Sequence, residues 1–489
     1  MNSIGSTYKL NADKAERWGV FELTLKGDGK GNPYTGVSIG AQFRFEHRVI
    51  EAEGFYDGDG IYKIRFMPDK QGKWSYVTNS SLPELDGIEG TFECTAPAEG
   101  NHGPVRVRNT WHFAYEDGTQ YAPVGTTCYV WNHQGERLEE QTLDTLKSAP
   151  FNKMRMCVFP KHYDFNKNEP EFYPFEGSVE GGWDFTRFKP AFFQHLEQRI
   201  KGLMELGIEA DLILFHPYDR WGFSKMPAEV DDRYLKYIVA RLSAFRNIWW
   251  SFANEYDFME EKKLEDWDRF FKLVQEKDPY GHLRSIHNAR GFYDHGKPWV
   301  THCSIQSHDI NRVYEWRNTY RKPVVIDECG YEGTINHNWG NLTGQEMVHR
   351  MWEGFFLGGY VGHGETYMNP EEVLWWSKGG VLHGTSPERI AFLRGIIEAG
   401  PDEGLTPFHN TWEVAYSGKE GEYYLYYFGN RQSSFKDIVL PADGCFTIDI
   451  IDCWEMTITP VDGTFSGKFR INIPAKPYIA LRACRKTGM

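Results

Sequence analysis

The segment that decides the fold is a short apolar run that ends in two polar residues, Ile248-Trp249-Trp250-Ser251-Phe252-Ala253-Asn254-Glu255. Its apolar part predicts a β-strand, because short apolar runs bounded by polar residues are typical of buried strands. A single Glu after a strand is usually a solvated loop residue. The meaning of Glu255 therefore depends on the segments around it.

Similar strands alternate with amphipathic helices from about residue 107 to residue 400. Eight strands are predicted, over residues 121–126, 153–159, 210–215, 248–253, 283–287, 300–306, 324–327 and 360–364. Helices are predicted over residues 136–148, 189–206, 228–244, 260–276, 344–356 and 387–398. This alternation favours an α/β fold, a (β/α)8 TIM barrel, over a doubly wound sheet. No GxGxxG or phosphate-loop motif follows any of these strands, which argues against nucleotide binding.

The two ends of the chain have a different pattern of apolar and polar residues. Short runs in which apolar and polar residues alternate, separated by Gly, Asp, Asn and Pro, extend from about residue 8 to residue 105. The same pattern returns after residue 405, in runs at 412–416, 422–428 and 446–450. Such runs predict antiparallel β-sandwiches. A chain of 489 residues should form two or three domains, and we expect them at 1–105, 106–402 and 403–489.

The overall composition excludes some partners. The formal charge of −14 argues against nucleic acid, and it makes an anionic membrane surface an unfavourable partner. Aromatic residues make up 16% of the chain, which suits a carbohydrate-binding protein, although large β-rich cores also use many aromatic rings.

The first residues form no leader pattern, and eight scattered cysteines indicate a reduced, cytoplasmic protein. If a leader was removed, the protein would instead be secreted.

A second strand end carries the matching carboxylate. The run Pro323-Val324-Val325-Ile326-Asp327-Glu328-Cys329-Gly330 places Glu328 at the end of the seventh predicted strand, whereas Glu255 ends the fourth. In a barrel, these two positions face each other across the mouth on the active-site side. Two carboxylates so placed suit glycoside hydrolysis by double displacement, in which one protonates the leaving oxygen and the other attacks the anomeric carbon.

These motifs resemble a known group of enzymes. The Asn254-Glu255 pair and the strand-ending Glu328 resemble the signature of clan A glycoside hydrolases. The flanking sandwiches and the run Tyr121-Ala122-Pro123-Val124-Gly125-Thr126-Thr127 resemble the apiosidase-like group of bacterial glycosidases. The resemblance implies a retaining mechanism, with Glu255 as acid/base, Glu328 as nucleophile and Asn254 on the sugar 2-hydroxyl. It does not identify the sugar.

Further candidates lie near the same strand ends. We expect Arg155 to pair with Glu328 and to lower the pKa of that carboxyl, which would keep it ionised. Candidates for substrate hydrogen bonds are His216, His287, Gln306 and His308, together with His363, and candidates for stacking on sugar are Tyr129, Trp131, Trp375 and Trp376. The histidines show no HExxH motif, so no metal is expected, and no motif indicates a cofactor.

Three alternatives remain open at this stage, one of which is a polysaccharide lyase that would yield unsaturated products. A non-catalytic carbohydrate-binding protein could have the same barrel, and a transglycosylase could use the same residues. The partner in every case is a carbohydrate, and assembly into a homo-oligomer stays open.

Overall fold

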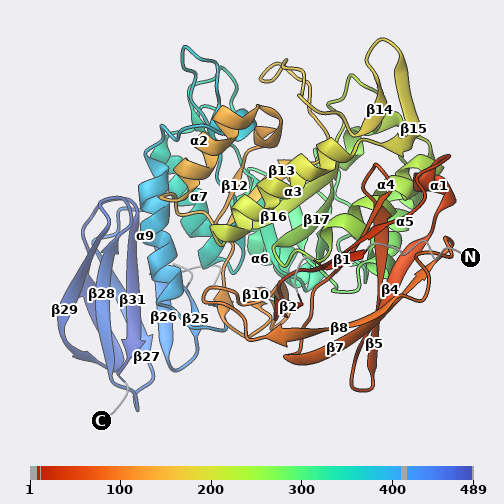
Figure 1. Ribbon diagram of the computed structural model, residues 1–489. Coiled ribbons are helices and arrows are strands. Elements are labelled where there is room, and N and C mark those ends of the chain that lie inside the picture. The colour runs from red at the N-terminus through yellow and green to blue at the C-terminus, as the bar shows by residue number, and fades with distance from the viewer. Residues whose placement is uncertain (1–7, 11–12, 409–415, 487–489) are drawn as a thin grey trace, which may run out of the picture.

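The computed structural model describes residues 8–10, 13–408 and 416–486 (Figure 1). Its centre is built from parallel strands in two sheets. The first sheet has the order β12 (Gly125–Thr127), β13 (Lys153–Cys157), β16 (Glu209–Phe215), β17 (Ile248–Ala253) and β18 (Leu283–Ser285). The second has the order β19 (Cys303–Gln306), β20 (Val324–Glu328) and β22 (Tyr360–Val361).

The two central sheets curve into a nearly closed, barrel-like arrangement. A parallel bridge between Thr126 and His363 joins the first strand to the segment after β22. On the other side, the backbone N–H of Thr301 donates to the carbonyl of Arg284 at 2.9 Å, next to β18 and β19. Consequently, Asn254, Gln306 and Glu328, which lie at the ends of three strands, line one cavity.

Helices cover the outside of these strands (Figure 1). They are α2 (Glu136–Leu146), α3 (Pro190–Glu205), α4 (Ala228–Leu242), α5 (Leu264–Lys277), α6 (Val313–Tyr320), α7 (Gly344–Phe356) and α9 (Ser386–Glu398). In α3 the buried residues Phe193, Leu196, Ile200 and Leu203 follow the spacing of one helix face. Six helices lie where the sequence predicts them, whereas α6 was not predicted. None of the helices in the described residues is long and apolar enough to cross a membrane.

The N-terminal strands form a sheet of their own. It contains β1 (Tyr8–Leu10), β2 (Lys14–Glu16), β3 (Phe21–Lys26), β4 (Ile39–Phe45), β5 (Arg48–Tyr56), β6 (Ile61–Phe66), β7 (Gly72–Ser80) and β8 (Glu89–Thr95), in the order β1-β3-β6-β5-β4-β7-β8-β2. Phe21, Leu23 and Leu25 alternate into its core. The short helix α1 (Pro33–Gly36) follows β3. The strands β9 (Val105–Arg108), β10 (His112–Tyr115) and β11 (Gln120–Tyr121) form a separate three-stranded sheet, whose Phe113 and Tyr121 pack against Trp249 of β17.

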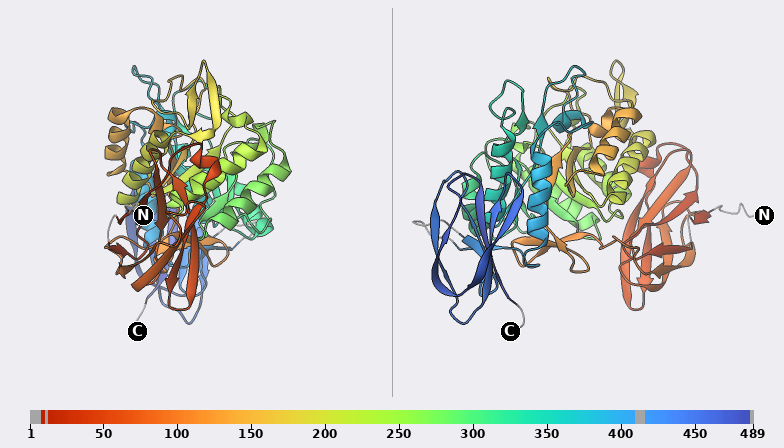
Figure 2. Two further views of the ribbon diagram at one scale, coloured as in Figure 1. Left: turned by 45° about the vertical axis from the view of Figure 1, so that its right-hand side comes forward. Right: turned by 90° about the vertical axis from the view of Figure 1, so that its left-hand side faces the viewer.

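The C-terminal strands lie on the side of the central part opposite to the N-terminal sheet (Figure 2). A six-stranded sheet has the order β24 (Thr406–Phe408), β25 (Tyr416–Lys419), β26 (Tyr423–Tyr427), β31 (Ile479–Arg485), β28 (Phe446–Asp452) and β29 (Thr457–Phe465). The pair β27 (Phe435–Leu440) and β30 (Gly467–Asn472) completes this part. The strand predicted at 412–416 lies outside the described residues except for Tyr416, which begins β25.

Loops at the carboxyl ends of the central strands carry short elements. The hairpin β14 (Phe175–Ser178) and β15 (Gly182–Phe188) follows β13, and the pair β21 (Glu332–Gly333) and β23 (Glu365–Thr366) follows β20 and β22. The helix α8 (Trp375–Lys378) lies in the loop before α9. These loops build the walls of the cavity described below.

A buried charge network joins the N-terminal sheet to the central part. Arg65 of β6 and Arg241 of α4 both bond to Glu197 of α3, at 2.8 Å in each case. Arg241 also bonds to Asp57 at 2.6 Å. Because buried charges are tolerated only when they are paired, the network fixes the sheet against α3 and α4.

Candidate active site

A cavity of about 340 Å³ lies at the carboxyl ends of the central strands. Glu255 lines it after β17, Gln306 ends β19 beside it, and Glu328 ends β20 beside it. The remaining wall comes from loops and is rich in aromatic rings: Tyr129, Tyr163, Phe165, Tyr218, Tyr331, Trp339 and Trp376. The cavity therefore combines two carboxylates with an aromatic lining, which suits a sugar ring with polar edges and apolar faces.

Glu255 is held by three side chains from three different segments. Its carboxylate accepts hydrogen bonds from Asn254 at 3.2 Å, from Gln306 at 3.3 Å and from the hydroxyl of Tyr218. The backbone of Glu255 is left-handed, with φ 52° and ψ 54°. That conformation is costly for a residue with a side chain and is found more often at functional sites.

Glu328 is held by a cation and a phenol. Nη1 of Arg155 lies 2.9 Å from Oε1 of Glu328, and the Tyr129 hydroxyl contacts the same oxygen. Burial raises the pKa of Glu328 to about 8, against the opposing effect of the nearby Tyr331 hydroxyl. The pairing with Arg155 is as the sequence suggests. The pKa of Glu328, however, moves in the direction opposite to the one expected from the cation alone, because removal from water is the larger effect.

Asn254 connects the two carboxylates. Its amide oxygen lies 2.9 Å from the Tyr129 hydroxyl and accepts from Arg155 at 3.3 Å. Its amide nitrogen donates to Glu255 at 3.2 Å. Since Tyr129 and Arg155 also contact Glu328, one amide side chain spans the distance between the partners of the two glutamates.

A layer of paired charges lies beneath Arg155. Lys153 bonds to Asp211 at 2.6 Å and to Asp327 at 2.7 Å, and all three side chains are buried. Ser304 donates to Asp327 at 2.5 Å. Arg155 is thus flanked by anions on both sides, with Asp211 at 3.9 Å from its Nε. This layer fixes the height at which the guanidinium meets Glu328.

Five of the candidate binding residues from the sequence line the cavity together with Glu255 and Glu328: Asn254, Tyr129, Gln306, His308 and Trp376. Arg155 lies behind Glu328 and reaches the cavity through it. His287 is fully buried, with Nε2 at 3.9 Å from Glu328, and burial lowers its pKa well below the usual value. It is a neutral neighbour beneath the carboxylate.

Four further candidates do not line the cavity, because their side chains have partners elsewhere. Nε1 of Trp131 donates to the sulfur of Met156, and Nε1 of Trp375 donates to Thr126. Nε2 of His216 lies 3.2 Å from the Phe159 carbonyl. His363 contacts Thr126 through Nδ1 and stacks on Phe151. These residues support the strand ends from behind.

Several residues of the cavity were not singled out from the sequence. Lys161, Tyr163 and Phe165 follow β13, Tyr218 follows β16, and Tyr331, His337 and Trp339 follow β20. Their only sequence signal was the aromatic content of the loops that follow these strands. That signal does not say which rings turn inward.

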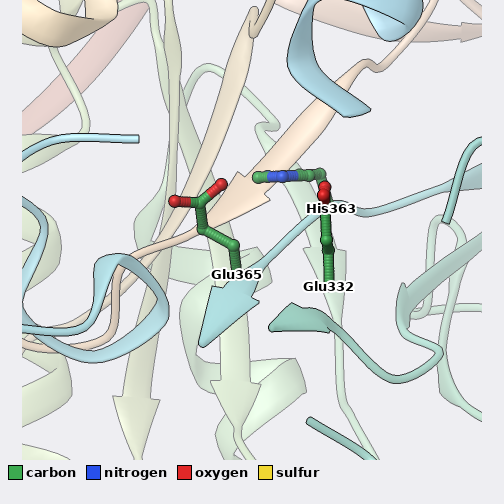
Figure 3. A group of neighbouring side chains, drawn as sticks. All are labelled: Glu332, His363 and Glu365. Atoms are coloured by element: carbon green, nitrogen blue, oxygen red, sulfur yellow. The ribbon is translucent and has the colours of Figure 1, made fainter. Parts of the chain in front are cut away.

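One buried group has the composition of a metal site. Glu332, His363 and Glu365 place potential ligand atoms within 4.8 Å of one another (Figure 3). The carboxylates already have donors: Glu332 accepts from Thr385, Ser386 and Tyr367, and Glu365 accepts from the backbone of His383 and Gly384. We interpret the two glutamates as the anchor of residues 383–386 at the start of α9, because satisfied carboxylates in this position hold a loop.

The fold and the cavity together define the class of protein. A barrel-like α/β core with two carboxylates at its strand ends, in an aromatic cavity, has the architecture of glycoside hydrolases. Residues 108–427 match the family described as "Apiosidase-like, catalytic domain". The chain therefore belongs to the apiosidase-like family. Residues 14–81 and 412–484 match two domains of unknown function, DUF5060 and DUF5605.

Solved structures agree with this assignment. A protein from Bacteroides vulgatus ATCC 8482, provisionally named a glycoside hydrolase, is 43% identical, with 97% of this chain and 100% of that chain covered and a TM-score of 0.93. A family 5 glycoside hydrolase from the same organism is 16% identical, with 78% and 94% covered and a TM-score of 0.60, which shows a shared fold. None of the curated proteins matches the chain.

Proposed function

We propose that this protein is a retaining glycoside hydrolase that cleaves O-glycosidic bonds of an oligo- or polysaccharide. In this proposal residues 106–402 form a (β/α)8 barrel, and residues 1–105 and 403–489 form two flanking β-sandwiches. The observation that carries the proposal is the arrangement around Asn254. Its two amide atoms contact Glu255 on one side and the partners of Glu328 on the other, so both carboxylates border one cavity.

In the first step Glu328 is the nucleophile. An oxygen of its carboxylate attacks the anomeric carbon and forms an ester, while the bond from that carbon to the leaving oxygen breaks. Arg155, at 2.9 Å, favours the ionised form that this attack requires. The departing oxygen takes a proton from Glu255, so no alkoxide is released.

In the second step Glu255 is the base. The ionised carboxylate takes a proton from water, the water oxygen bonds to the anomeric carbon, and the ester to Glu328 breaks. Hydrogen bonds from Tyr218, Gln306 and Asn254 hold the carboxylate in place at this stage. Both residues return to their starting protonation states.

Other side chains would hold the sugar. Asn254 is placed between the two carboxylates, where its amide can also reach a hydroxyl beside the anomeric carbon. Trp376 and the neighbouring ring of Trp339, with centroids 5.1 Å apart, form an apolar wall against which a sugar face can stack. Gln306 and His308 supply polar groups on the side of β19.

The decisive experiment traps the covalent intermediate. A panel of aryl glycosides is first screened for hydrolysis, and the matching 2-deoxy-2-fluoro glycoside is then incubated with the protein. The proposal expects a stoichiometric mass increase located on the peptide that contains Glu328, and a product with the anomeric configuration of the substrate by NMR. Label on another carboxylate, or inversion of the anomeric carbon, would overturn the assignment.

The same panel of glycosides separates hydrolysis from non-catalytic carbohydrate binding and from transglycosylation. A non-catalytic carbohydrate-binding protein would bind sugars without releasing aryl alcohol from any member of the panel. A transglycosylase would transfer the glycosyl group to an added acceptor sugar in preference to water. Glu328→Gln provides the background control, because it removes the nucleophile and keeps the size of the side chain.

A further inference from the structure

Lys161 places a buried ammonium group beside the cavity. It follows β13, lines the cavity, and is only 2% exposed. Its Nζ lies 3.5 Å from the ring centre of Tyr129, 4.2 Å from that of Tyr218 and 4.6 Å from that of Tyr163. These distances are within the range in which a cation is attracted to an aromatic face.

Two of these three rings carry the hydroxyls that contact the candidate catalytic carboxylates. The Tyr129 hydroxyl contacts Glu328, and the Tyr218 hydroxyl donates to Glu255. One ammonium group consequently touches the faces of both phenols whose edges meet the two glutamates.

The charge of Lys161 is compensated mainly by these rings. Within the described residues, no carboxylate lies within 4.0 Å of its Nζ. Burial lowers the pKa of Lys161 to about 8, while Cys157 and Glu255 act in the opposite direction. A buried cation must find favourable partners, and aromatic faces supply them where a carboxylate does not.

We infer that Lys161 is a positioning residue. It holds Tyr129 and Tyr218 by their ring faces and thereby fixes the positions of the two glutamates relative to each other. The inference rests on the proposed function for the roles of the glutamates. A cation over a phenol also withdraws electron density from the ring, which strengthens the hydrogen bond that its hydroxyl donates. Losing the cation should loosen both carboxylates at once.

The first test compares kinetic constants of three variants. In Lys161→Met the side chain keeps all but one atom of its length, stays unbranched and loses its charge. We expect kcat to fall by about 30-fold, the size of one desolvated cation–π contact, with KM changed less than threefold. Lys161→Arg should recover most of the activity, because a guanidinium stacks on aromatic faces. The control is Lys167→Met in the same loop, whose side chain is 68% exposed.

A rise in KM with kcat unchanged would overturn the inference, because it would mean that Lys161 binds the substrate directly. Equal kinetics in wild type and Lys161→Met would overturn it as well. If the wild type hydrolyses no glycoside at all, the proposed function fails instead, and the two failures stay distinguishable.

A double-mutant cycle tests the route through the tyrosine. Tyr218→Phe keeps the ring face and removes the hydroxyl that meets Glu255. If Lys161 acts through that hydroxyl, Lys161→Met should cost less than tenfold in the Tyr218→Phe background, compared with about 30-fold in wild type. Additive losses would contradict the coupling.

A spectroscopic measurement tests, without any substrate, the cage that the rings of Tyr129, Tyr163 and Tyr218 form around the ammonium group of Lys161. In protein labelled with ¹³C at the lysine Cε, the resonance missing from Lys161→Arg is that of Lys161. Three ring faces should shift its protons upfield of the other lysines. A resonance at the ordinary lysine position would overturn the cage, and this result does not require Lys161→Met to fold.

Discussion

Nη1 of Arg155 lies 2.9 Å from Oε1 of Glu328, at the end of the central strand β20. Arg155 is 1% exposed and the side chain of Glu328 is 11% exposed, so the pair is largely removed from water. Burial and pairing act in opposite directions on the carboxyl. Burial is the larger effect and raises the pKa of Glu328 to about 8, with the Tyr331 hydroxyl opposing it, which places the ionisation of Glu328 within the range of a kinetic experiment.

The first prediction is a pH profile. If Glu328 must be ionised to attack, kcat/KM should rise with pH. The midpoint of this rise, the acid limb of the profile, should lie near pH 8. Arg155→Met removes the cation that favours the ionised form, so the acid limb should move to higher pH. The measurement is kcat/KM of wild type and Arg155→Met between pH 5 and pH 10 on one aryl glycoside. An acid limb that stays in place in Arg155→Met would contradict the link between the pair and the profile.

The second prediction concerns the leaving group. Glu255→Ala removes the proposed proton donor, and general acid catalysis is worth about 10²–10⁴ in rate. We expect a loss of this size for a glycoside with a basic alcohol as leaving group. For a dinitrophenyl glycoside, which departs without a proton, the first step should be nearly as fast as in wild type. Pre-steady-state release of dinitrophenol measures that step, and an equal loss for both substrates would argue against the role.

The third prediction separates two adjacent tryptophans. Trp376 lines the cavity, whereas Trp375 donates a hydrogen bond to Thr126 at 2.9 Å in the interior. Trp376→Phe should raise KM by about tenfold through lost stacking area, with little change in stability. Trp375→Phe should instead lower the free energy of unfolding by about 1 kcal/mol with KM unchanged, because it breaks one buried hydrogen bond. Steady-state kinetics and urea unfolding test both, and the opposite assignment of effects would contradict the placement.

The strand pattern was a good guide to the two glutamates and a poor guide to their surroundings. Ile248–Ala253 is buried throughout, and the following Asn254 and Glu255 reach the cavity because a parallel strand delivers its last residues to one rim. Glu328 reaches the same cavity for the same reason, because it is the last residue of β20. An apolar run that ends in a carboxylate predicted a strand end at each glutamate, and the count of strands along the chain predicted that the two lie at one rim.

The cavity wall could not be predicted in this way, since loops place it. Trp375 and Trp376 are neighbours in sequence, and only the helix α8 decides that one turns inward and the other faces the cavity. Lys161 and Tyr218 come from different loops, and tertiary packing alone brings them to 4.2 Å. The helix α6 was missed because it is short, and its valine and aromatic residues are weak helix formers.

The last prediction concerns the joint between the N-terminal sheet and the central part. Arg241 is fully buried and bonds to Asp57 at 2.6 Å and to Glu197 at 2.8 Å. Burial disfavours the ionised form of Glu197, yet Arg65 and Arg241 outweigh it and hold the pKa of that carboxyl at about 2. Replacing Arg241 by Met would leave two carboxylates buried with a partner missing.

We expect Arg241→Met to lower the free energy of unfolding by about 3–5 kcal/mol at pH 7, as for other broken buried ion pairs. Arg470→Met is the matched control, because Arg470 and Asp437 form an exposed pair at 2.7 Å that should contribute about 0–1 kcal/mol. The pH dependence has a definite sign. The folded-state pKa of Glu197 lies below its unfolded value of about 4.3, so its stabilising contribution is present above that value and is lost as pH falls toward 2. The difference between wild type and Arg241→Met should therefore shrink between pH 5 and pH 2 in urea unfolding. Equal unfolding midpoints at pH 7 would show that the sheet is held to α3 and α4 by apolar contacts instead.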